Sequence, residues 1–116
     1  MNKLLISTLL FFILSCKSQN CEQLPQTYLS YSEALSKITN ASFEVSDSVN
    51  TSSSSWIKKA KFYSCDSAKG FLVLETSKDA YIFKDVPIQV WNKFKKANSF
   101  GSFYNQKIKG KYQLVI

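Results

Sequence analysis

Hydrophobic and polar positions follow different patterns in successive parts of the chain, and each pattern predicts a different element. Residues 4–14 form a nearly continuous apolar run. Residues 30–38 repeat their apolar side chains every three or four positions, as one face of a helix does. Residues 56–85 contain β-branched and aromatic runs broken by turns, and residues 87–109 return to helical spacing. Strict alternation at residues 112–116 predicts a final strand.

The first helix of the folded region is expected to begin after Ser30. Ser30 and Glu33 form a capping box, in which the serine hydroxyl accepts a backbone N–H and the glutamate reaches back to the cap. The apolar stripe that follows consists of Tyr31, Ala34, Leu35 and Ile38. We expect this stripe to pack against the rest of the domain, and contact with a partner is the alternative.

Three strands are expected in the middle of the chain. Residues 56–63 are rich in strand formers but carry several lysines, which suits an exposed strand. Residues 71–76 are apolar on both faces and predict a central strand. Residues 80–85 place Tyr81 and Phe83 on the same face, because side chains alternate along a strand.

Two helices are expected after these strands. Pro87 suits the first turn of a helix, where its missing N–H has no partner to lose. The spacing of Trp91 and Phe94 turns both rings toward the sheet. A second helix is predicted over residues 99–109, with Gly110 as its terminator.

These elements predict an α+β fold: a small antiparallel sheet of three or four strands with two C-terminal helices packed on it. The chain order is β-β-β-α-α-β, preceded by one short helix. This domain is expected to span residues 55–116. Residues 16–26 are predicted to be a tether and residues 27–45 a short helix with an extension. Residues 46–55, seven of them Ser or Thr, are predicted to be a flexible connector.

The apolar run near the start has the layout of a secretory signal peptide covering residues 1–15, with Lys3 before it. A transmembrane helix would need about 20 apolar residues. Ile13-Leu14-Ser15-Cys16 resembles a bacterial lipobox, in which the cysteine thiol receives a diacylglycerol and becomes the new N-terminus. The resemblance implies that Cys16 carries fatty acyl chains such as palmitate. An ordinary signal peptide, with Cys16 a plain thiol, is the alternative.

The lipobox also implies a location, the cell envelope, with the protein lipid-anchored on the periplasmic face of a bacterial membrane. Cys16-Lys17-Ser18 looks like the start of a lipoprotein of the Bacteroidetes type. Two tripeptides, Asp47-Ser48-Val49 and Asp66-Ser67-Ala68, resemble the O-glycosylation pattern of periplasmic proteins from that group. Their use would place glycans on Ser48 and Ser67, and chance matches are the alternative.

Charge is distributed unevenly. Residues 17–55 carry two lysines and four acids, whereas residues 56–116 carry twelve lysines and four acids. A basic domain favours an anionic partner such as nucleic acid, lipid headgroups or an acidic polysaccharide. An AT-rich genome, which favours lysine codons, is the alternative. The chain contains no arginine, the residue that provides a bidentate fork for phosphate.

Two cysteines remain if Cys16 is lipidated. Cys21 and Cys65 form an even pair in an oxidising compartment, so one disulfide is permitted. It would tie the N-terminal arm to the basic domain. Two unpaired thiols are the alternative.

Residues 55–116 resemble the KTSC domain, which is named for its occurrence at the C-terminus of some lysyl-tRNA synthetases. The matching pieces are Ser55-Trp56-Ile57, Tyr81-Ile82-Phe83, Val86-Pro87, the run from Ala97 to Asn105, and Ile108-Lys109. The family's central motif is usually Tyr-x-Tyr, and here Phe83 lacks the second hydroxyl. The resemblance implies a domain of about sixty residues without an established activity, for which RNA binding has been suggested.

Catalytic chemistry is sparse in the sequence. The chain has no histidine, which removes the usual general base and the commonest metal ligand. Its three glycines form no phosphate-binding loop, and its eight acids have no paired spacing. We therefore expect no enzyme activity, no metal and no cofactor.

The function expected from these observations is that of a lipid-anchored envelope protein with a small binding or accessory domain for a protein or envelope component. A nucleic-acid or polyanion-binding module is the alternative, with aromatic rings stacking beside lysines. The candidate binding residues are Tyr81, Phe83, Trp91, Lys95, Lys96, Tyr104, Asn105, Lys107 and Lys109. For Tyr81 and Phe83, packing beneath the Trp91 helix is the alternative to a ligand platform.

Overall fold

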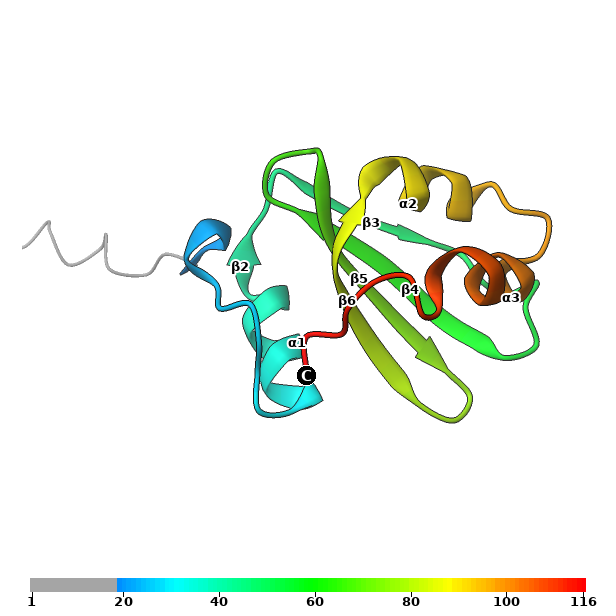
Figure 1. Ribbon diagram of the computed structural model, residues 1–116, viewed down its shortest axis with the longest axis horizontal. Coiled ribbons are helices and arrows are strands. Elements are labelled where there is room, and N and C mark those ends of the chain that lie inside the picture. Colours follow the sequence, from blue (N-terminus) through cyan, green and yellow to red (C-terminus); the bar gives the residue numbers. More distant parts are fainter. Residues whose placement is uncertain (1–18) are drawn as a thin grey trace, which may run out of the picture.

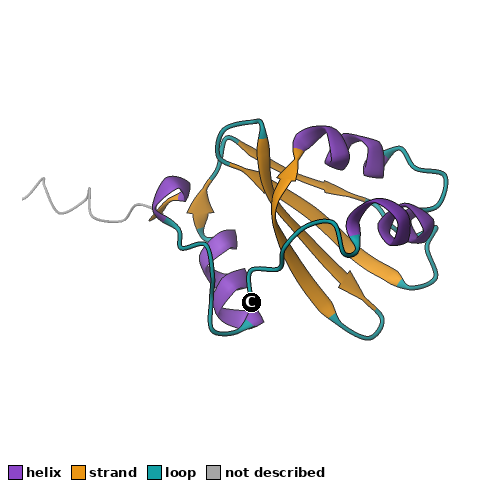
Figure 2. Ribbon diagram, viewed as in Figure 1, coloured by secondary structure: helices purple, strands orange, loops and turns teal. Residues whose placement is uncertain are grey.

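The computed structural model describes residues 19–116, and it is built around a four-stranded antiparallel sheet with the strand order β3-β4-β5-β6 (Figures 1 and 2). The strands are β3 (Val45–Val49), β4 (Ile57–Ser64), β5 (Lys69–Thr76) and β6 (Ala80–Pro87). The principal helices are α1 (Tyr31–Thr39), α2 (Ile88–Lys95) and α3 (Phe100–Phe103). The fold is therefore α+β, as the sequence predicts. The predicted signal peptide and the predicted lipidation site, Cys16, lie outside the described residues.

Both faces of the sheet are covered. Leu72 and Leu74 of β5 point into a core formed with α2, α3 and the turn after α3. Val73, on the opposite face of the same strand, joins a second core under α1. Figure 1 shows α1 on one side of the sheet and α2 and α3 on the other. This arrangement explains why residues 71–76 are apolar on both faces.

A short segment on the N-terminal side closes the second face. Strand β1 (Gln19–Asn20) pairs in parallel with β2 (Ala41–Ser42), and the 3₁₀ turn η2 (Cys21–Gln23) follows β1. A disulfide joins Cys21 to Cys65 in the β4–β5 loop, with 5.9 Å between the Cα atoms. We call residues 20–43 the N-terminal clasp. The prediction of a tether over residues 16–26 was wrong for 19–26, because these residues are held against the domain.

The predicted connector also contains structure. Strand β3 pairs with β4 through the register Val45↔Ser64 to Val49↔Ala60, so the connector prediction was wrong for residues 46–49. Val45, Asp47 and Val49 turn inward and are half-buried, while Ser46 and Ser48 face outward. A serine-rich edge strand needs only one covered face. The outward serines of β3 made its alternation of inward and outward residues resemble a flexible linker in the sequence.

The C-terminal part differs from the prediction in two respects. The single helix expected over 99–109 is the short helix α3 followed by η3 (Tyr104–Ile108), a π-helical turn. The backbone N–H of Lys109 donates to the carbonyl of Tyr104, five residues earlier, at 2.9 Å, which is the hydrogen bond of a π-helical turn. Gly110 ends the segment with φ of +77°, a left-handed conformation that glycine adopts readily.

The final strand predicted at residues 112–116 is reduced to one bridge, Phe83↔Leu114. Tyr112, Leu114 and Ile116 alternate in the sequence, but Val115 is the fully buried residue of this segment, and its N–H donates to the Ile82 carbonyl at 3.0 Å. Among residues 19–116 no helix combines the length and hydropathy needed to cross a membrane.

Candidate binding pocket

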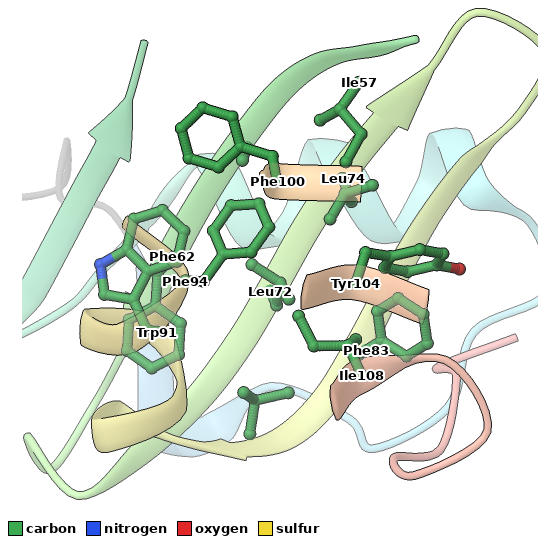
Figure 3. Packing of buried hydrophobic residues seen from close by; sticks show 12 residues of the cluster. Ile57, Phe62, Leu72, Leu74, Phe83, Trp91, Phe94, Phe100, Tyr104 and Ile108 are labelled. Atoms are coloured by element: carbon green, nitrogen blue, oxygen red, sulfur yellow. The ribbon is translucent and has the colours of Figure 1, made fainter. Parts of the chain in front are cut away.

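Three of the aromatic candidates, Phe83, Trp91 and Tyr104, belong to the buried core, and Tyr104 also lines the pocket described below. Phe83 is 4% exposed and Trp91 is 1% exposed. Figure 3 shows both rings among the packed side chains between the sheet and the C-terminal helices. Trp91 stacks on Phe62 with 5.5 Å between ring centroids and 11° between planes. Phe83 is buried, as the packing alternative expects, but its ring partners are Tyr81 and Tyr104, each with 6.1 Å between ring centroids, so it packs beside the π-helical turn.

Trp91 and Lys95 also share an acidic partner on β3. The Trp91 indole N–H donates to Asp47 Oδ2 at 2.9 Å, and Lys95 Nζ donates to the same oxygen at 2.6 Å. These bonds hold the pKa of the Asp47 carboxyl below its usual value, first through Lys95 and then through Trp91. Lys95 Nζ also lies 5.6 Å from the Trp91 ring centroid. The cluster fastens α2 to the edge strand, which gives both residues a structural role.

A separate pocket of about 360 Å³ lies where β4 begins, beside the β5–β6 turn and the π-helical turn. Trp56, Tyr81 and Tyr104 provide its aromatic surface. The remaining lining residues are polar: Thr76, Ser77, Lys78, Asp79, Asn105 and Lys109. Small-molecule sites in proteins commonly have volumes of about 300–1,000 Å³ and this mixture of aromatic and polar groups. We call it the aromatic pocket.

The position of Trp56 depends on Gly101. A Cβ atom at residue 101 would lie 2.6 Å from Trp56 Nε1 and 2.9 Å from Cζ2, so only glycine lets the indole approach α3 this closely. The Trp56 ring meets Tyr104 edge-on, with centroids 5.8 Å apart and an interplanar angle of 72°. Tyr104 in turn stacks near Tyr81 at 6.5 Å and 26°. The three rings therefore form one continuous wall.

The π-helical turn sets the directions of the C-terminal pocket residues. Tyr104 is buried at 5% exposure, whereas Asn105 and Lys109 are exposed at the rim. Figure 3 shows the Tyr104 hydroxyl pointing away from the packed rings. Burial, with a smaller contribution from Tyr81, raises the pKa of this phenol above its ordinary value. Single π-helical turns occur frequently at functional sites.

A larger cavity of about 420 Å³ lies along the β3–β4 connection. It is lined by residues 48–52, Ser54 and residues 57–61, which include three lysines and no aromatic residue. We regard the aromatic pocket as the better candidate because it joins several elements and carries rings that can contact a ligand.

The structure brings some predicted residues together and separates others. Tyr81, Tyr104, Asn105 and Lys109 meet at the aromatic pocket. Lys96 and Lys107 are exposed but do not line it. Trp56 and Lys78 also line the pocket, although neither was predicted as a site residue. The one sequence feature that could have indicated the site is the presence of both Trp56 and Gly101, which are in contact in the fold.

Two further sets of residues have defined positions. Ser48 and Ser67 are both exposed, one on the edge strand β3 and one in the β4–β5 loop. Their glycosylation stays a prediction. Across residues 19–116 the structure contains no group of three or more Cys, Asp or Glu side chains placed to hold a metal ion.

The fold and pocket define a small α+β domain with an aromatic site at one end of its sheet. Residues 53–112 match the KTSC domain family, and the chain belongs to that family. The match includes every residue that lines the aromatic pocket, while β3 and the N-terminal clasp lie outside it. The chain matches neither a curated protein nor a solved structure.

Proposed function

We propose that this protein is a lipid-anchored envelope protein whose KTSC domain is a non-catalytic binding module. The observation that carries the binding role is the aromatic pocket, with Trp56, Tyr81 and Tyr104 on one wall and polar side chains around them. Three rings held by packing offer a rigid apolar surface, which lowers the entropic cost of binding. The exposed amide of Asn105 adds hydrogen-bonding capacity at the rim.

The pocket composition supports binding over catalysis. Asp79 is the one carboxylate among its lining residues, and no histidine or thiol accompanies it. Cys21 and Cys65, the cysteines among the described residues, are joined to each other and provide no free nucleophile. Acid–base or nucleophilic catalysis would need a second positioned group.

The lipid anchor is supported by the sequence around Cys16 and has a direct test. Cells expressing the full chain would be labelled with an alkyne fatty acid and fractionated, next to cells expressing Cys16→Ala. We expect label on the wild-type protein in the envelope fraction and none on the variant. An unlabelled wild-type protein in the cytoplasm would contradict the anchor.

A polyanion-binding role is the second candidate, favoured by Lys78 and Lys109 on the rim of the aromatic pocket. Lysines next to aromatic rings suit an anionic chain whose sugars or bases contact the rings. Single-stranded DNA and a sulfated polysaccharide would be titrated at several salt concentrations. Binding should weaken steeply with salt, because counterions are released.

Matched substitutions make this titration specific to the pocket. Lys78→Gln combined with Lys109→Gln should reduce both the affinity and the salt slope. Lys107→Gln, on the same π-helical turn but outside the pocket, should have a much smaller effect. Affinity that does not change with salt would eliminate polyanion binding and leave a neutral or protein ligand.

A further inference from the structure

We propose that the aromatic pocket binds an acidic sugar, a pyranose ring that carries a carboxylate. This inference deepens the proposed binding role and rests on it. It follows from three features of the pocket: the aromatic wall, the carboxylate and amide at its rim, and the lysines beside them. These groups correspond to the parts of such a sugar, which has an apolar C–H face, several hydroxyls and one negative charge.

The aromatic wall can contact the apolar face of a sugar ring. Trp56 and Tyr81 are half-buried and line the pocket, and Tyr104, which contacts both rings, lies between them in the wall. The face of an aromatic ring carries negative partial charge, which attracts the weakly positive C–H groups on one face of a pyranose. A nucleic-acid base would also stack on this wall, so the choice between the two ligands depends on the polar rim.

Hydrogen bonds hold the β5–β6 turn, which provides one part of this rim. Thr76 Oγ1 accepts the backbone N–H of Lys78 at 3.2 Å and that of Asp79 at 2.9 Å. The same hydroxyl donates to the Asp79 carbonyl at 3.0 Å. The Ser77 N–H donates to the Trp56 carbonyl at 2.8 Å, which fastens the turn to the aromatic wall. A ligand therefore meets the wall and the turn in a preformed arrangement, which lowers the entropic cost of binding.

Asp79 favours a sugar over a nucleic acid. Its Oδ2 accepts a hydrogen bond from the Tyr81 hydroxyl at 3.5 Å. In the described part of the chain this exposed carboxylate forms no salt bridge, so most of its acceptor capacity is open to a ligand. Sugar hydroxyls are donors that suit a carboxylate, whereas a DNA phosphate has no donor and is repelled by it. The exposed amide of Asn105 both donates and accepts, as neighbouring sugar hydroxyls require.

Lys78 and Lys109 provide the positive charge that an acidic sugar requires. Both are exposed, and within residues 19–116 neither forms an ion pair. Lys78 lies on the β5–β6 turn and Lys109 directly follows η3, so two elements bring positive charge to the same rim. Two lysines and one aspartate leave one net positive charge among the lining residues, which suits a sugar unit with one carboxylate. A lysine ammonium is a point charge and can pair with a single carboxylate oxygen.

The experiment titrates the full chain, purified in detergent, with matched probes by isothermal calorimetry. Sugar carboxylates have two common sources, and one probe represents each. Tetragalacturonate carries its carboxylates as uronic acids, and the disaccharide of N-acetylglucosamine and N-acetylmuramic acid carries one on a lactyl ether. Each probe is compared with its methyl ester, which keeps the same rings without the charge. An oligothymidylate with the same charge as tetragalacturonate represents a nucleic acid.

We expect one of the acidic sugars to bind about fivefold more tightly than its methyl ester, the upper value for one ion pair at an exposed site. The oligothymidylate should bind more weakly than that sugar. Equal affinity for the acid and its ester would overturn the acidic character of the ligand. Binding of the oligothymidylate alone would overturn the sugar and leave the polyanion form of the proposed function.

Substitution of Asp79 separates the two ligand classes by the direction of the effect. Asp79→Ala should weaken binding of the acidic sugar by about threefold to tenfold, because a hydrogen bond is lost. The same variant should strengthen binding of the oligothymidylate, because a repulsive charge is removed. Glu44→Ala, the same change of charge at an exposed position outside the pocket, should alter neither affinity.

A second variant and a measurement in cells keep the inference separate from the proposed function. Asn105→Ala, which changes no charge, should weaken the acidic sugar without altering the salt dependence of binding. A sugar affinity unchanged in both Asp79→Ala and Asn105→Ala would overturn the assignment to this pocket. If no probe binds, the acidic sugar is overturned. The proposed binding role is overturned as well only if a photoreactive residue at position 105 captures nothing in cells.

Discussion

Asp47 illustrates how an acidic residue is accommodated on the inner face of an edge strand. Its side chain is 37% exposed, and its Oδ2 accepts hydrogen bonds from Trp91 and Lys95 on α2. The bonds connect residues more than forty positions apart in the chain. An apolar residue at this position would leave the buried indole N–H of Trp91 without its acceptor. Asp47 therefore joins β3 to the sheet–helix core.

We expect Asp47→Asn to lower the free energy of unfolding by about 0.5–1 kcal/mol at neutral pH, since the ion pair is partly screened by solvent. The folded-state pKa of Asp47 lies below its ordinary value of 3.8. The carboxylate is therefore stabilising above that value, and this stabilisation is lost as the pH falls through the lower folded-state pKa. Urea denaturation across this range measures the effect.

The control for Asp47 is Glu44→Gln, an exposed position one residue before β3. Glu44→Gln should change the free energy of unfolding only slightly across the same pH range. The stability difference between wild type and Asp47→Asn should close toward the acidic end of the range. A difference that stays constant to the lowest pH would contradict the assigned ion pair.

Gly101 supports the aromatic pocket through the space that it leaves. Gly101→Ala would place a Cβ atom 2.6 Å from the Trp56 indole nitrogen. We expect a loss of about 1–3 kcal/mol in stability, as for other overpacked sites, and a shift in Trp56 fluorescence in a Trp91→Phe background. Ser102→Ala, at the exposed neighbouring position, is the control. An unshifted Trp56 spectrum would show that the glycine does not set the indole position.

At the scale of elements, the N-terminal clasp gives the sheet a second covered face. Ala34 and Ile38 of α1 are fully buried against the face that carries Val73 and Ile82. The Tyr28 N–H donates to the Val115 carbonyl at 2.9 Å, which ties the clasp to the end of the chain. The clasp lies outside the family match, so residues N-terminal to the matched region cover this face.

The disulfide should contribute strongly to the stability of this arrangement. It closes a loop with a sequence separation of 44 residues. A loop of this length predicts a stabilisation of about 4 kcal/mol from chain entropy, and measured values are commonly 2–4 kcal/mol. We expect Cys21→Ser with Cys65→Ser to lower the urea midpoint accordingly. Intact mass after alkylation without reductant should detect no thiol at either cysteine, and two alkylated thiols would contradict the bridge.

The elements also show which parts of the fold the sequence predicts. Residues 71–76 and the helix beginning after Pro87 were recognisable because local pattern and tertiary environment agree. Strand β3 was missed because its outer serines resemble a linker and its inward Asp47 resembles a surface residue. The final strand predicted from alternation at the end of the chain is reduced to one bridge, and Val115, between two exposed apolar residues, is the residue that packs.

At the scale of the whole molecule, the aromatic pocket was only partly predictable. Tyr81, Tyr104, Asn105 and Lys109 were named from their types and spacing, and they meet at one site. Trp56 joins them through a tertiary contact with Gly101, which no local pattern reveals. The choice between a buried ring and an exposed ring likewise depends on helix placement, which explains why Trp91 and Phe83 lie in the core.

The most direct test of the binding role is site-specific photocrosslinking of the full chain in living cells. A photoreactive residue would replace Asn105, at the rim of the aromatic pocket, or Lys107, two residues away and outside it. We predict a discrete adduct from position 105 that disappears when Trp56→Ala is added, and no such adduct from position 107. Equal adducts at both positions, or none at position 105, would contradict the pocket as the binding site.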